Sequence, residues 1–200
     1  MNTPQAHLVD DDEAIRDALS WLLKSRNIPS RTYASAEDFL AAWTPQLSGC
    51  VVLDMRMTGM TGLDCFERLQ EKNSRLPVIF LTGHGDVPLA VATLKRGAFD
   101  FFEKPLNDND LATRISEAMT LETAQRASNA SQDSVNRRLE SLTNRERQIM
   151  DLVLAGKLNK IIADELNISM RTVEVHRANL FDKMQIKTAV ELANLLKPKR

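Results

Sequence analysis

Five polar residues follow short apolar runs and have the types needed to transfer a phosphoryl group. They are Asp10 and Asp11 after "HLV", Asp54 at the end of "VVLD", Thr82 at the end of "IFLT", and Lys104 after "DFFE". Neighbouring carboxylates repel one another by about 1 kcal/mol per pair in water, so they require positive charge nearby. Oxygen ligands without His or Cys suit Mg²⁺, for which Mn²⁺ could substitute. Lys104 supplies a second positive charge, and Asp54 is the expected nucleophile, forming an aspartyl phosphate.

Short β-type runs alternate with helical segments in the first part of the chain and could bring these residues together. This alternation predicts a parallel sheet covered by helices on both faces. The flavodoxin-like strand order 2-1-3-4-5 would place the carboxyl ends of strands one, three, four and five side by side, where ligands bind. The predicted strands are Gln5–Val9, Ser30–Tyr33, 50–53, 77–81 and 99–102.

Capping residues predict where the first helices begin. Asp12 and Glu13 are expected to open the first helix, where its free N–H groups and dipole favour negative charge. Ser35 precedes "AEDFLAAW", and Asp108 is expected to open a later helix. The intervening helix is predicted to begin near Asp86 and Pro88 and to close at Gly97.

Composition favours an ordinary globular protein of the cytoplasm. The 200 residues are 43% hydrophobic, with a net charge of −1. No apolar run approaches the roughly 18 residues of a membrane span, and the first residues lack the layout of a secretory signal. Cys50 and Cys65 lie in apolar surroundings without a metal or redox spacing, which indicates packing roles.

Charge divides the chain into an acidic and a basic part. Residues 1–139 contain 15 basic and 19 acidic side chains, whereas residues 140–200 contain 11 basic and 8 acidic ones. The two parts therefore carry −4 and +3, and the basic part is compatible with contact to nucleic acid. Residues 122–138 contain few large apolar side chains, so we expect a helical linker between domains at 1–121 and 139–200.

The final segment has the pattern of an all-α domain of four short helices. Capping-box pairs occur at Thr143 with Glu146 and at Thr188 with Glu191. In "ISMRTVEVHRANLFDKM", an apolar stripe leaves a valine and an alanine beside charged residues on the other face. Such a face could pack on a partner, but it also suits a DNA major groove, where apolar groups meet thymine methyls. The stripe consists of Val173, His176, Leu180 and Met184, and we interpret His176 as a packing residue.

The motifs "VDD", "LDMRMTGMTGLD", "LTGHGD" and "EKP" make residues 1–121 resemble a two-component receiver domain. This resemblance implies that a sensor histidine kinase phosphorylates Asp54. It implies that Asp11 and Asp54 ligate Mg²⁺ directly, that Asp10 acts through water, and that the backbone carbonyl of Arg56 is a further ligand.

The same resemblance assigns roles to residues on the last two strands. Thr82 and Phe101 would form a switch pair that responds to phosphorylation. Lys104 would hold the phosphoryl group, and its bond to Pro105 would be cis.

The stretch "LTNRERQIMDLVLAGKLNKIIADELNISMRTVEVHRANLFDKMQIKTAVELA" resembles the LuxR/NarL/FixJ-type helix-turn-helix. The resemblance implies a scaffold helix at Asn159–Leu166 and a recognition helix at 172–184. Ile161 departs from the family, which commonly has an acidic residue there, and is expected to widen the packed face. The candidate phosphate contacts are Lys160, Arg171, Thr172, Arg177 and Lys183, and the candidate base contacts are Glu174, Val175, Ala178 and Asn179.

Together, the two resemblances imply a response regulator that controls transcription rather than an enzyme, and that catalyses only its own phosphorylation and dephosphorylation. Phosphorylation by the sensor kinase would promote a homodimer that binds promoter DNA at two half-sites and works with RNA polymerase. Within the family, the chain resembles regulators of aromatic-compound catabolism, which suggests such an operon as its target.

Three alternatives are open on the sequence. A haloacid-dehalogenase-like phosphatase also uses an aspartate and Mg²⁺, but it requires a second acid where this chain has Arg56. A nucleotide-binding oxidoreductase requires a glycine-rich turn where this chain has "DDDEA". A DNA-binding protein that acts without phosphorylation is disfavoured by the complete acidic set.

Overall fold

The computed structural model describes residues 3–83 and 87–197 of the chain. The chain divides into two compact units, the N-terminal unit Met1–Ala127 and the C-terminal unit Ser128–Arg200. Each unit has its own hydrophobic core.

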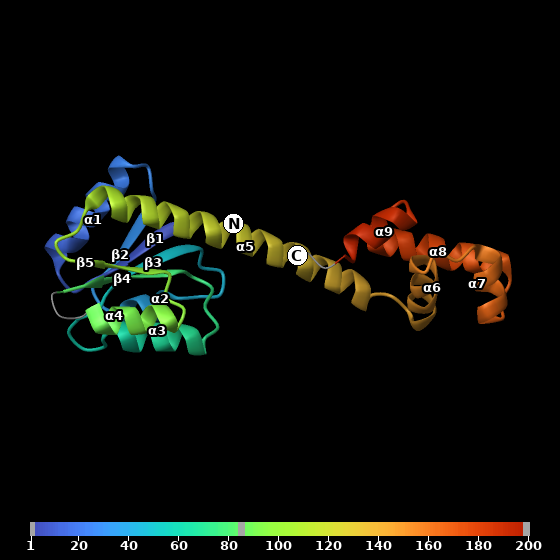
Figure 1. Ribbon diagram of the computed structural model, residues 1–200, viewed down its shortest axis with the longest axis horizontal. Helices are drawn as coiled ribbons and strands as arrows, with labels where there is room; N and C mark the ends of the chain where they lie inside the picture. The colour runs from blue at the N-terminus through green and yellow to red at the C-terminus, as the bar shows by residue number, and fades with distance from the viewer. Residues whose placement is uncertain (1–2, 84–86, 198–200) are drawn as a thin grey trace. The chain divides into compact units, whose positions relative to one another are not determined.

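A parallel sheet forms the centre of the N-terminal unit (Figure 1). Its order is β2-β1-β3-β4-β5, which confirms the predicted 2-1-3-4-5 topology. Asp54 pairs with Leu81, and Thr82 pairs with Glu103, so the carboxyl ends of these strands meet at one edge. The observed strands are β1 Gln5–Val9, β2 Ser30–Tyr33, β3 Gly49–Asp54, β4 Val78–Thr82 and β5 Asp100–Glu103.

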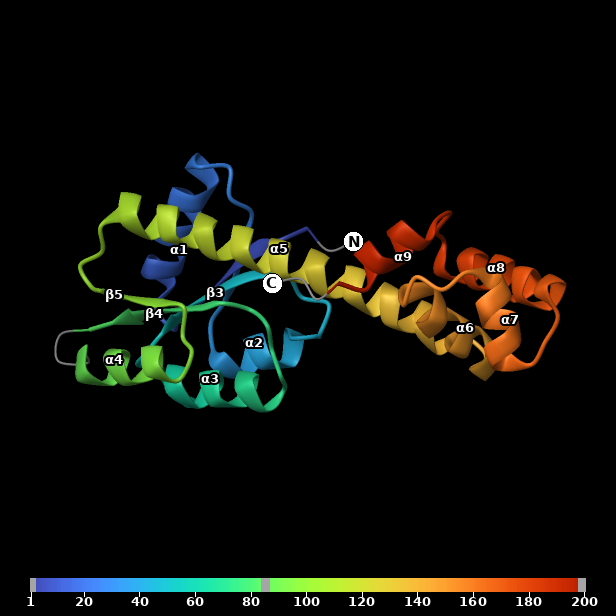
Figure 2. The same cartoon turned by 45° about the vertical axis from the view of Figure 1, so that its right-hand side comes forward.

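Helices cover both faces of the sheet, with α1 and the first half of α5 on one face and α2, α3 and α4 on the other (Figure 2). Leu8 of β1, Leu23 of α1 and Ile115 of α5 are buried in the core on the first face. Phe39 of α2 and Phe80 of β4 are buried in the core on the second face. The helices are α1 Glu13–Ser25, α2 Ala36–Ala42, α3 Gly62–Glu71, α4 Val87–Lys95 and α5 Asp108–Glu140.

Side-chain caps explain where several of these helices begin. Asp12 accepts a hydrogen bond from Ala14 N, and Ser35 accepts one from Asp38 N, as predicted. Helix α5 begins at Asp108, as predicted, and its side-chain cap is the preceding Asn107, whose Oδ1 accepts from Asn109 N and Asp110 N. Asp86, the predicted start of α4, lies outside the described residues.

Helix α5 continues through the segment predicted as a linker. Glu122 is buried, and its Oε2 accepts from Ser48 Oγ at 2.7 Å and Gly49 N at 3.3 Å. Arg126 donates to the carbonyl of Leu47 and, at 2.6 Å, to Glu122 Oε1. These bonds fasten α5 to the start of β3, so the N-terminal unit extends beyond the predicted boundary at residue 121.

The C-terminal unit is helical, as predicted. Its core contains Ile149, Ile162, Val173 and Leu180. Thr143 and Glu146 form the predicted capping box, and Thr188 accepts from Glu191 N. The helix predicted to be the recognition helix begins at Met170 rather than at residue 172, because Ser169 caps it by accepting from Thr172 N. The helices are α6 Asn144–Leu154, α7 Asn159–Leu166, α8 Met170–Met184 and α9 Ala189–Leu195.

Among the helices that the structure describes, none combines the length and the apolar character that a membrane crossing requires.

Candidate functional site

Three predicted residues meet at the carboxyl edge of the sheet. Asp10 and Asp54 are nearly inaccessible to solvent, with 2% and 6% of their surface exposed. Lys104 Nζ donates to Asp10 Oδ2 at 2.9 Å and to Asp54 Oδ1 at 2.5 Å. The ammonium therefore offsets the repulsion between two buried carboxylates.

Backbone bonds hold these side chains in place. Asp10 Oδ1 accepts from Asp12 N at 2.9 Å, and Asp54 Oδ2 accepts from Arg56 N at 2.8 Å. Lys104 N donates to the carbonyl of Thr82 at 2.8 Å, and the Lys104–Pro105 bond is cis, as predicted. The side chains of Asp10, Asp54 and Lys104 therefore meet where their strands end.

Burial and mutual contact set the proton affinities of this group. Burial raises the pKa of Asp54 above its ordinary value, and the negative charge of Asp10 also acts to raise it, although Lys104 opposes both. Burial alone would lower the pKa of Lys104, but its hydrogen bonds to Asp54 and Asp10 outweigh burial and leave the pKa raised. Asp54 is therefore a more basic carboxylate than a solvated one, beside a firmly protonated lysine.

Asp11 completes the acidic set from the solvent side. Asp11 is exposed, and its Oδ2 accepts from Thr58 N at 2.8 Å and from Thr58 Oγ1 at 2.9 Å. One carboxylate oxygen from each of Asp10, Asp11 and Asp54 lies within 4.8 Å of the others. This all-oxygen, anionic donor set fits a hard divalent cation. We name Asp10, Asp11, Asp54 and Lys104 the acidic pocket.

The predicted switch residues lie beside the acidic pocket, on β4 and β5. Thr82 is fully buried, and its hydroxyl makes a long bond of 3.4 Å to the Phe102 carbonyl. Phe101 pairs with Phe80 in the sheet and is half-buried against the core below α3 and α4. Phe101 is thus partly in the core and partly at the surface.

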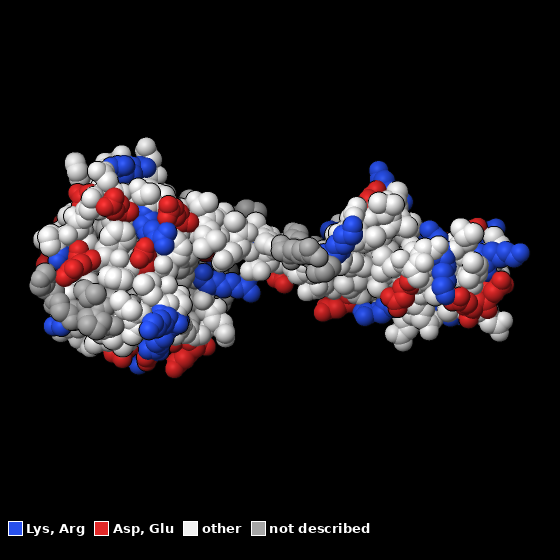
Figure 3. All heavy atoms as spheres, in the orientation of Figure 1, with Lys and Arg blue, Asp and Glu red and all other residues white. Residues whose placement is uncertain are grey.

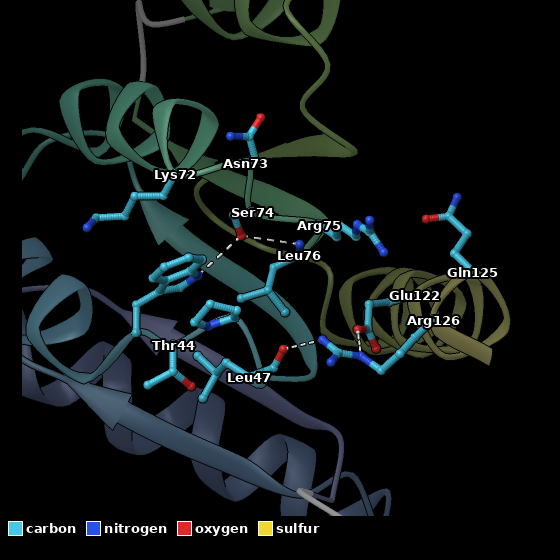
Figure 4. A pocket seen from close by; sticks show the side chains of 12 residues that line it. Thr44, Leu47, Lys72, Asn73, Ser74, Arg75, Leu76, Glu122, Gln125 and Arg126 are labelled. Carbon is cyan, nitrogen blue, oxygen red and sulfur yellow. Dashed lines mark hydrogen bonds and ion pairs between the residues drawn. The ribbon is translucent and has the colours of Figure 1, made fainter. Parts of the chain in front are cut away.

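A pocket of about 360 Å³ lies at the opposite, amino-terminal edge of the sheet (Figure 4). It lies between the segments before β3 and β4 and helix α5, with Leu47, Leu76 and Arg126 in its wall. Its buried carboxylate, Glu122, already bonds to Ser48 and Arg126. None of the predicted site residues lines this pocket, so the acidic pocket is the candidate reactive site.

The candidate base contacts lie on the outward face of α8. Val175 is 53% exposed, and Glu174, Ala178 and Asn179 are also exposed. The buried stripe behind them contains Val173, Leu180 and Met184, while His176 is half-buried. On the face shown in Figure 3, basic and acidic side chains are interspersed. On α8 itself, Arg171, Glu174 and Asp182 are exposed and Arg177 is half-buried, so the helix presents a mixed surface rather than a single basic patch.

The candidate phosphate contacts differ in how free they are. Lys160 and Arg171 are exposed, and Thr172 Oγ1 lies 2.8 Å from the capping hydroxyl of Ser169. Arg177 is held, because its Nη1 donates to Asn159 Oδ1 at 2.7 Å and its guanidinium lies 5.5 Å from the centre of the Phe181 ring. Asn159 opens α7 and was not among the predicted site residues.

Lys183 differs from the other candidate phosphate contacts because a buried carboxylate binds its ammonium. Its ammonium donates to Glu146 Oε2 at 2.7 Å and to the carbonyl of Ser141 at 3.2 Å. Glu146 is buried, which would raise its pKa, but Lys183 and Thr143 outweigh burial and lower it. Lys183 therefore ties α8 to the start of α6. The capping-box signature in the sequence predicted the role of Glu146 at the start of α6. No nearby sequence feature predicted that Lys183 would bind its carboxylate.

The expectation that Ile161 widens the packed face of α7 is wrong. Ile161 is 45% exposed on α7, whereas its neighbour Ile162 is fully buried. Successive helical residues point in directions about 100° apart, and because α7 buries Ile162 and Ala163, Ile161 is turned toward the surface. Ile161 adds an apolar surface residue and does not widen the packed face.

Comparisons with known proteins agree with both units. Residues 6–116 match the response regulator receiver domain, and residues 140–196 match the luxR family of bacterial regulatory proteins. These are regulatory families, unlike the phosphatase and the oxidoreductase considered as alternatives. The chain is 46% identical to the C4-dicarboxylate transport transcriptional regulatory protein DctR of Rhodobacter capsulatus, over 94% of this chain and 97% of that one.

Two further relatives extend along nearly the whole chain. The transcriptional regulatory protein FixJ of Bradyrhizobium diazoefficiens is 42% identical, over 94% of this chain and 92% of that one. A low-resolution structure of the response regulator StyR is 37% identical, with a TM-score of 0.93 over 98% of this chain and 99% of that one. The chain therefore belongs to the FixJ/NarL family of two-component response regulators, in which a receiver domain partnered by a sensor kinase is joined to a LuxR-type DNA-binding domain that regulates transcription.

Proposed function

We propose that Asp54 is the phosphoacceptor and that the acidic pocket catalyses its own phosphorylation and dephosphorylation. The observation that carries this proposal is the contact of Lys104 with two buried carboxylates, Asp10 and Asp54. A cation held between buried carboxylates stabilises the negative charge that develops during phosphoryl transfer.

The proposed metal ligands are Asp11 and Asp54, with Asp10 acting through water and the Arg56 backbone carbonyl as a further ligand. The closeness of the three carboxylates supports this assignment. When bound, Mg²⁺ would neutralise part of their charge and that of the phosphoryl oxygens. Mn²⁺ prefers similar ligands and is expected to substitute.

The chain's own groups then have distinct parts in the transfer. An oxygen of Asp54 attacks the phosphorus of the kinase phosphohistidine, and the P–N bond breaks as the imidazole leaves. Lys104 Nζ, now 2.5 Å from Asp54 Oδ1, is near enough to donate to a phosphoryl oxygen instead. Water later attacks the same phosphorus and regenerates the Asp54 carboxylate.

Thr82 and Phe101 are the proposed link from phosphate to the rest of the molecule. The only hydrogen bond described for the buried Thr82 hydroxyl is long, so Thr82 can exchange it for a bond to a phosphoryl oxygen. Movement of Thr82 would let the half-buried Phe101 turn inward, which changes the surface beside β4 and β5. That altered surface is where we place dimerisation.

The dimer then presents two α8 helices to a promoter with two half-sites, about one DNA turn apart or a multiple of it. We retain the predicted base contacts and remove Lys183 from the phosphate contacts, because Glu146 binds its ammonium. Lys160, Arg171, Thr172 and Arg177 remain. RNA polymerase is the proposed final partner, in the cytoplasm. The aromatic-catabolism target stays a prediction, since the name of DctR refers to C4-dicarboxylate transport.

Phosphorylation with acetyl phosphate and Mg²⁺, followed by DNA footprinting, tests the proposal. The wild-type chain should gain one alkali-labile phosphoryl group and protect a two-half-site sequence more strongly. Asp54→Asn should gain none and show no enhancement, whereas Asp17→Asn, at an exposed acid on α1, should behave as wild type. Labelling of Asp54→Asn at the wild-type rate would show that another residue is the acceptor.

A further inference from the structure

Thr58 makes two hydrogen bonds to a single oxygen at the rim of the acidic pocket. Its backbone N–H and its hydroxyl both donate to Asp11 Oδ2, at 2.8 and 2.9 Å. A carboxylate oxygen has about two lone pairs for such bonds, so Thr58 occupies Oδ2. The other oxygen of Asp11 is then the one available to a cation.

The loop that carries Thr58 is anchored independently of Asp11. Glu37 of α2 accepts from Met60 N at 2.9 Å, and Gly62 N donates to the carbonyl of Met55 at 3.2 Å. At Gly62 the loop runs so close to β3 that a side-chain carbon there would lie 2.1 Å from the Asp54 carbonyl oxygen. Of the two hydrogen-bonded residues Thr58 and Asp11, Thr58 is therefore the one whose position is set by other contacts.

Asp11 is the partner that needs fixing. It is exposed, whereas Asp10 and Asp54 are buried and bonded to Lys104. An exposed carboxylate explores several rotamers, and a ligand must remove that freedom when it binds. A group that holds the carboxylate in advance strengthens binding by sparing this cost.

We propose that Thr58 is a positioning residue for the metal site: it holds Asp11 so that the free carboxylate oxygen faces a cation shared with Asp10 and Asp54. This inference rests on the proposed function, because it concerns the affinity of the same pocket for Mg²⁺. In this role Thr58 acts through Asp11 and not directly on the metal or the phosphoryl group.

Calorimetric titration of the full-length, unphosphorylated chain with Mg²⁺ tests the inference. Thr58→Val keeps the shape of the side chain and removes the hydroxyl, so we expect the dissociation constant to rise about fivefold. Thr58→Ser keeps the hydroxyl and should bind nearly as wild type. Thr120→Val is the matched control, because the hydroxyl of this exposed threonine bonds within α5, to Ser116 O.

Two further measurements separate positioning from general stability. Without Mg²⁺, Thr58→Val should unfold at the same temperature as the Thr120→Val control. Glu37→Ala removes the bond to Met60 N and frees the loop, so it should weaken Mg²⁺ binding by a smaller factor than Thr58→Val.

The outcomes distinguish this inference from the proposed function. Wild-type binding of Mg²⁺ together with unchanged or tighter binding by Thr58→Val would overturn the role of Thr58 alone. Equal losses in Thr58→Val and Thr58→Ser would also overturn it, since the serine hydroxyl should rescue. A wild-type chain that binds no Mg²⁺ would overturn the proposed metal site, and this inference with it.

Discussion

The acidic pocket and the outward face of α8 place charge in opposite ways. In the pocket, Asp10 and Asp54 are buried and share one ammonium, that of Lys104. On α8, Val175 is exposed, and Arg177 is the candidate phosphate contact bonded to another helix. One region is assembled before its ligand arrives, and the other is largely left open.

The difference follows from what each ligand brings. A phosphoryl group in transfer requires donors and charge at fixed positions in a site shielded from water, so the protein must arrange them in advance. DNA brings an ordered array of phosphates and base edges, so exposed side chains can adjust to it. Rigid placement therefore matters most in the first region, and charge and shape matter most in the second.

The largest expected effect is on phosphorylation, and it distinguishes Asp11 from its neighbour Asp12. Asp11→Ala should reduce Mg²⁺-dependent phosphorylation more than 100-fold, on the order of the loss of a metal ligand. Asp12→Ala should leave phosphorylation intact and cost about 1 kcal/mol of stability, because Asp12 caps α1. Phosphate incorporation and urea unfolding measure the two. Equal losses of phosphorylation would show that Asp12 belongs to the site.

Lys183 and Arg177 both lie on α8, but their substitution should affect different properties. Loss of Lys183 should lower stability, and loss of Arg177 should weaken DNA binding. Lys183→Met leaves buried Glu146 without its cation, and should lower the stability of the C-terminal unit by about 2 kcal/mol, allowing for the partial exposure of the lysine. Arg177→Ala should weaken DNA binding about tenfold and reduce the salt slope by about 1. Unfolding followed by circular dichroism measures the stability change in Lys183→Met, and DNA binding at several salt concentrations measures the change in Arg177→Ala.

Val175→Ala provides the control for base contact. It should change the preference for one base pair while leaving the salt slope unchanged, because its side chain carries no charge. A reduced salt slope in Lys183→Met would return Lys183 to the phosphate contacts. An unchanged slope in Arg177→Ala would mean that its bond to Asn159 is purely structural.

The smallest effect concerns a buried histidine away from the pocket. His7 lies in the core, bonded to the Ser48 carbonyl, and burial lowers its pKa from the ordinary 6.5. The unfolded chain therefore takes up the proton first, so stability should fall as pH drops below about 6.5, by at most about 1.4 kcal/mol per pH unit.

His7→Gln should make this pH dependence shallower between pH 6.5 and the folded-state pKa. Urea unfolding followed by tryptophan fluorescence reports the N-terminal unit alone, because both tryptophans, Trp21 and Trp43, lie in it. An identical pH slope in wild type and variant would assign the effect to other groups.

Much of the fold was predictable because its signals are local. The alternation of apolar runs predicted every described strand to within about one residue, and the resemblance to the LuxR/NarL/FixJ-type helix-turn-helix implied α7 at its observed bounds, Asn159–Leu166. The motifs predicted the meeting of Asp10, Asp54 and Lys104, because parallel strands must end at the same edge. The start of α5 at Asp108 was also predictable, and the preceding Asn107 caps the helix by accepting from Asn109 N and Asp110 N.

Local sequence patterns and motifs were sufficient to predict the architecture, the family and the residues of the acidic pocket. Which long side chains are already bound to a partner depends instead on how distant elements pack together. The Lys183–Glu146 contact joins residues 37 apart in the chain, and the Thr58–Asp11 contact joins residues 47 apart. Periodicity shows which face of a helix is buried, but a flexible side chain takes whichever partner the packing of distant elements brings within reach.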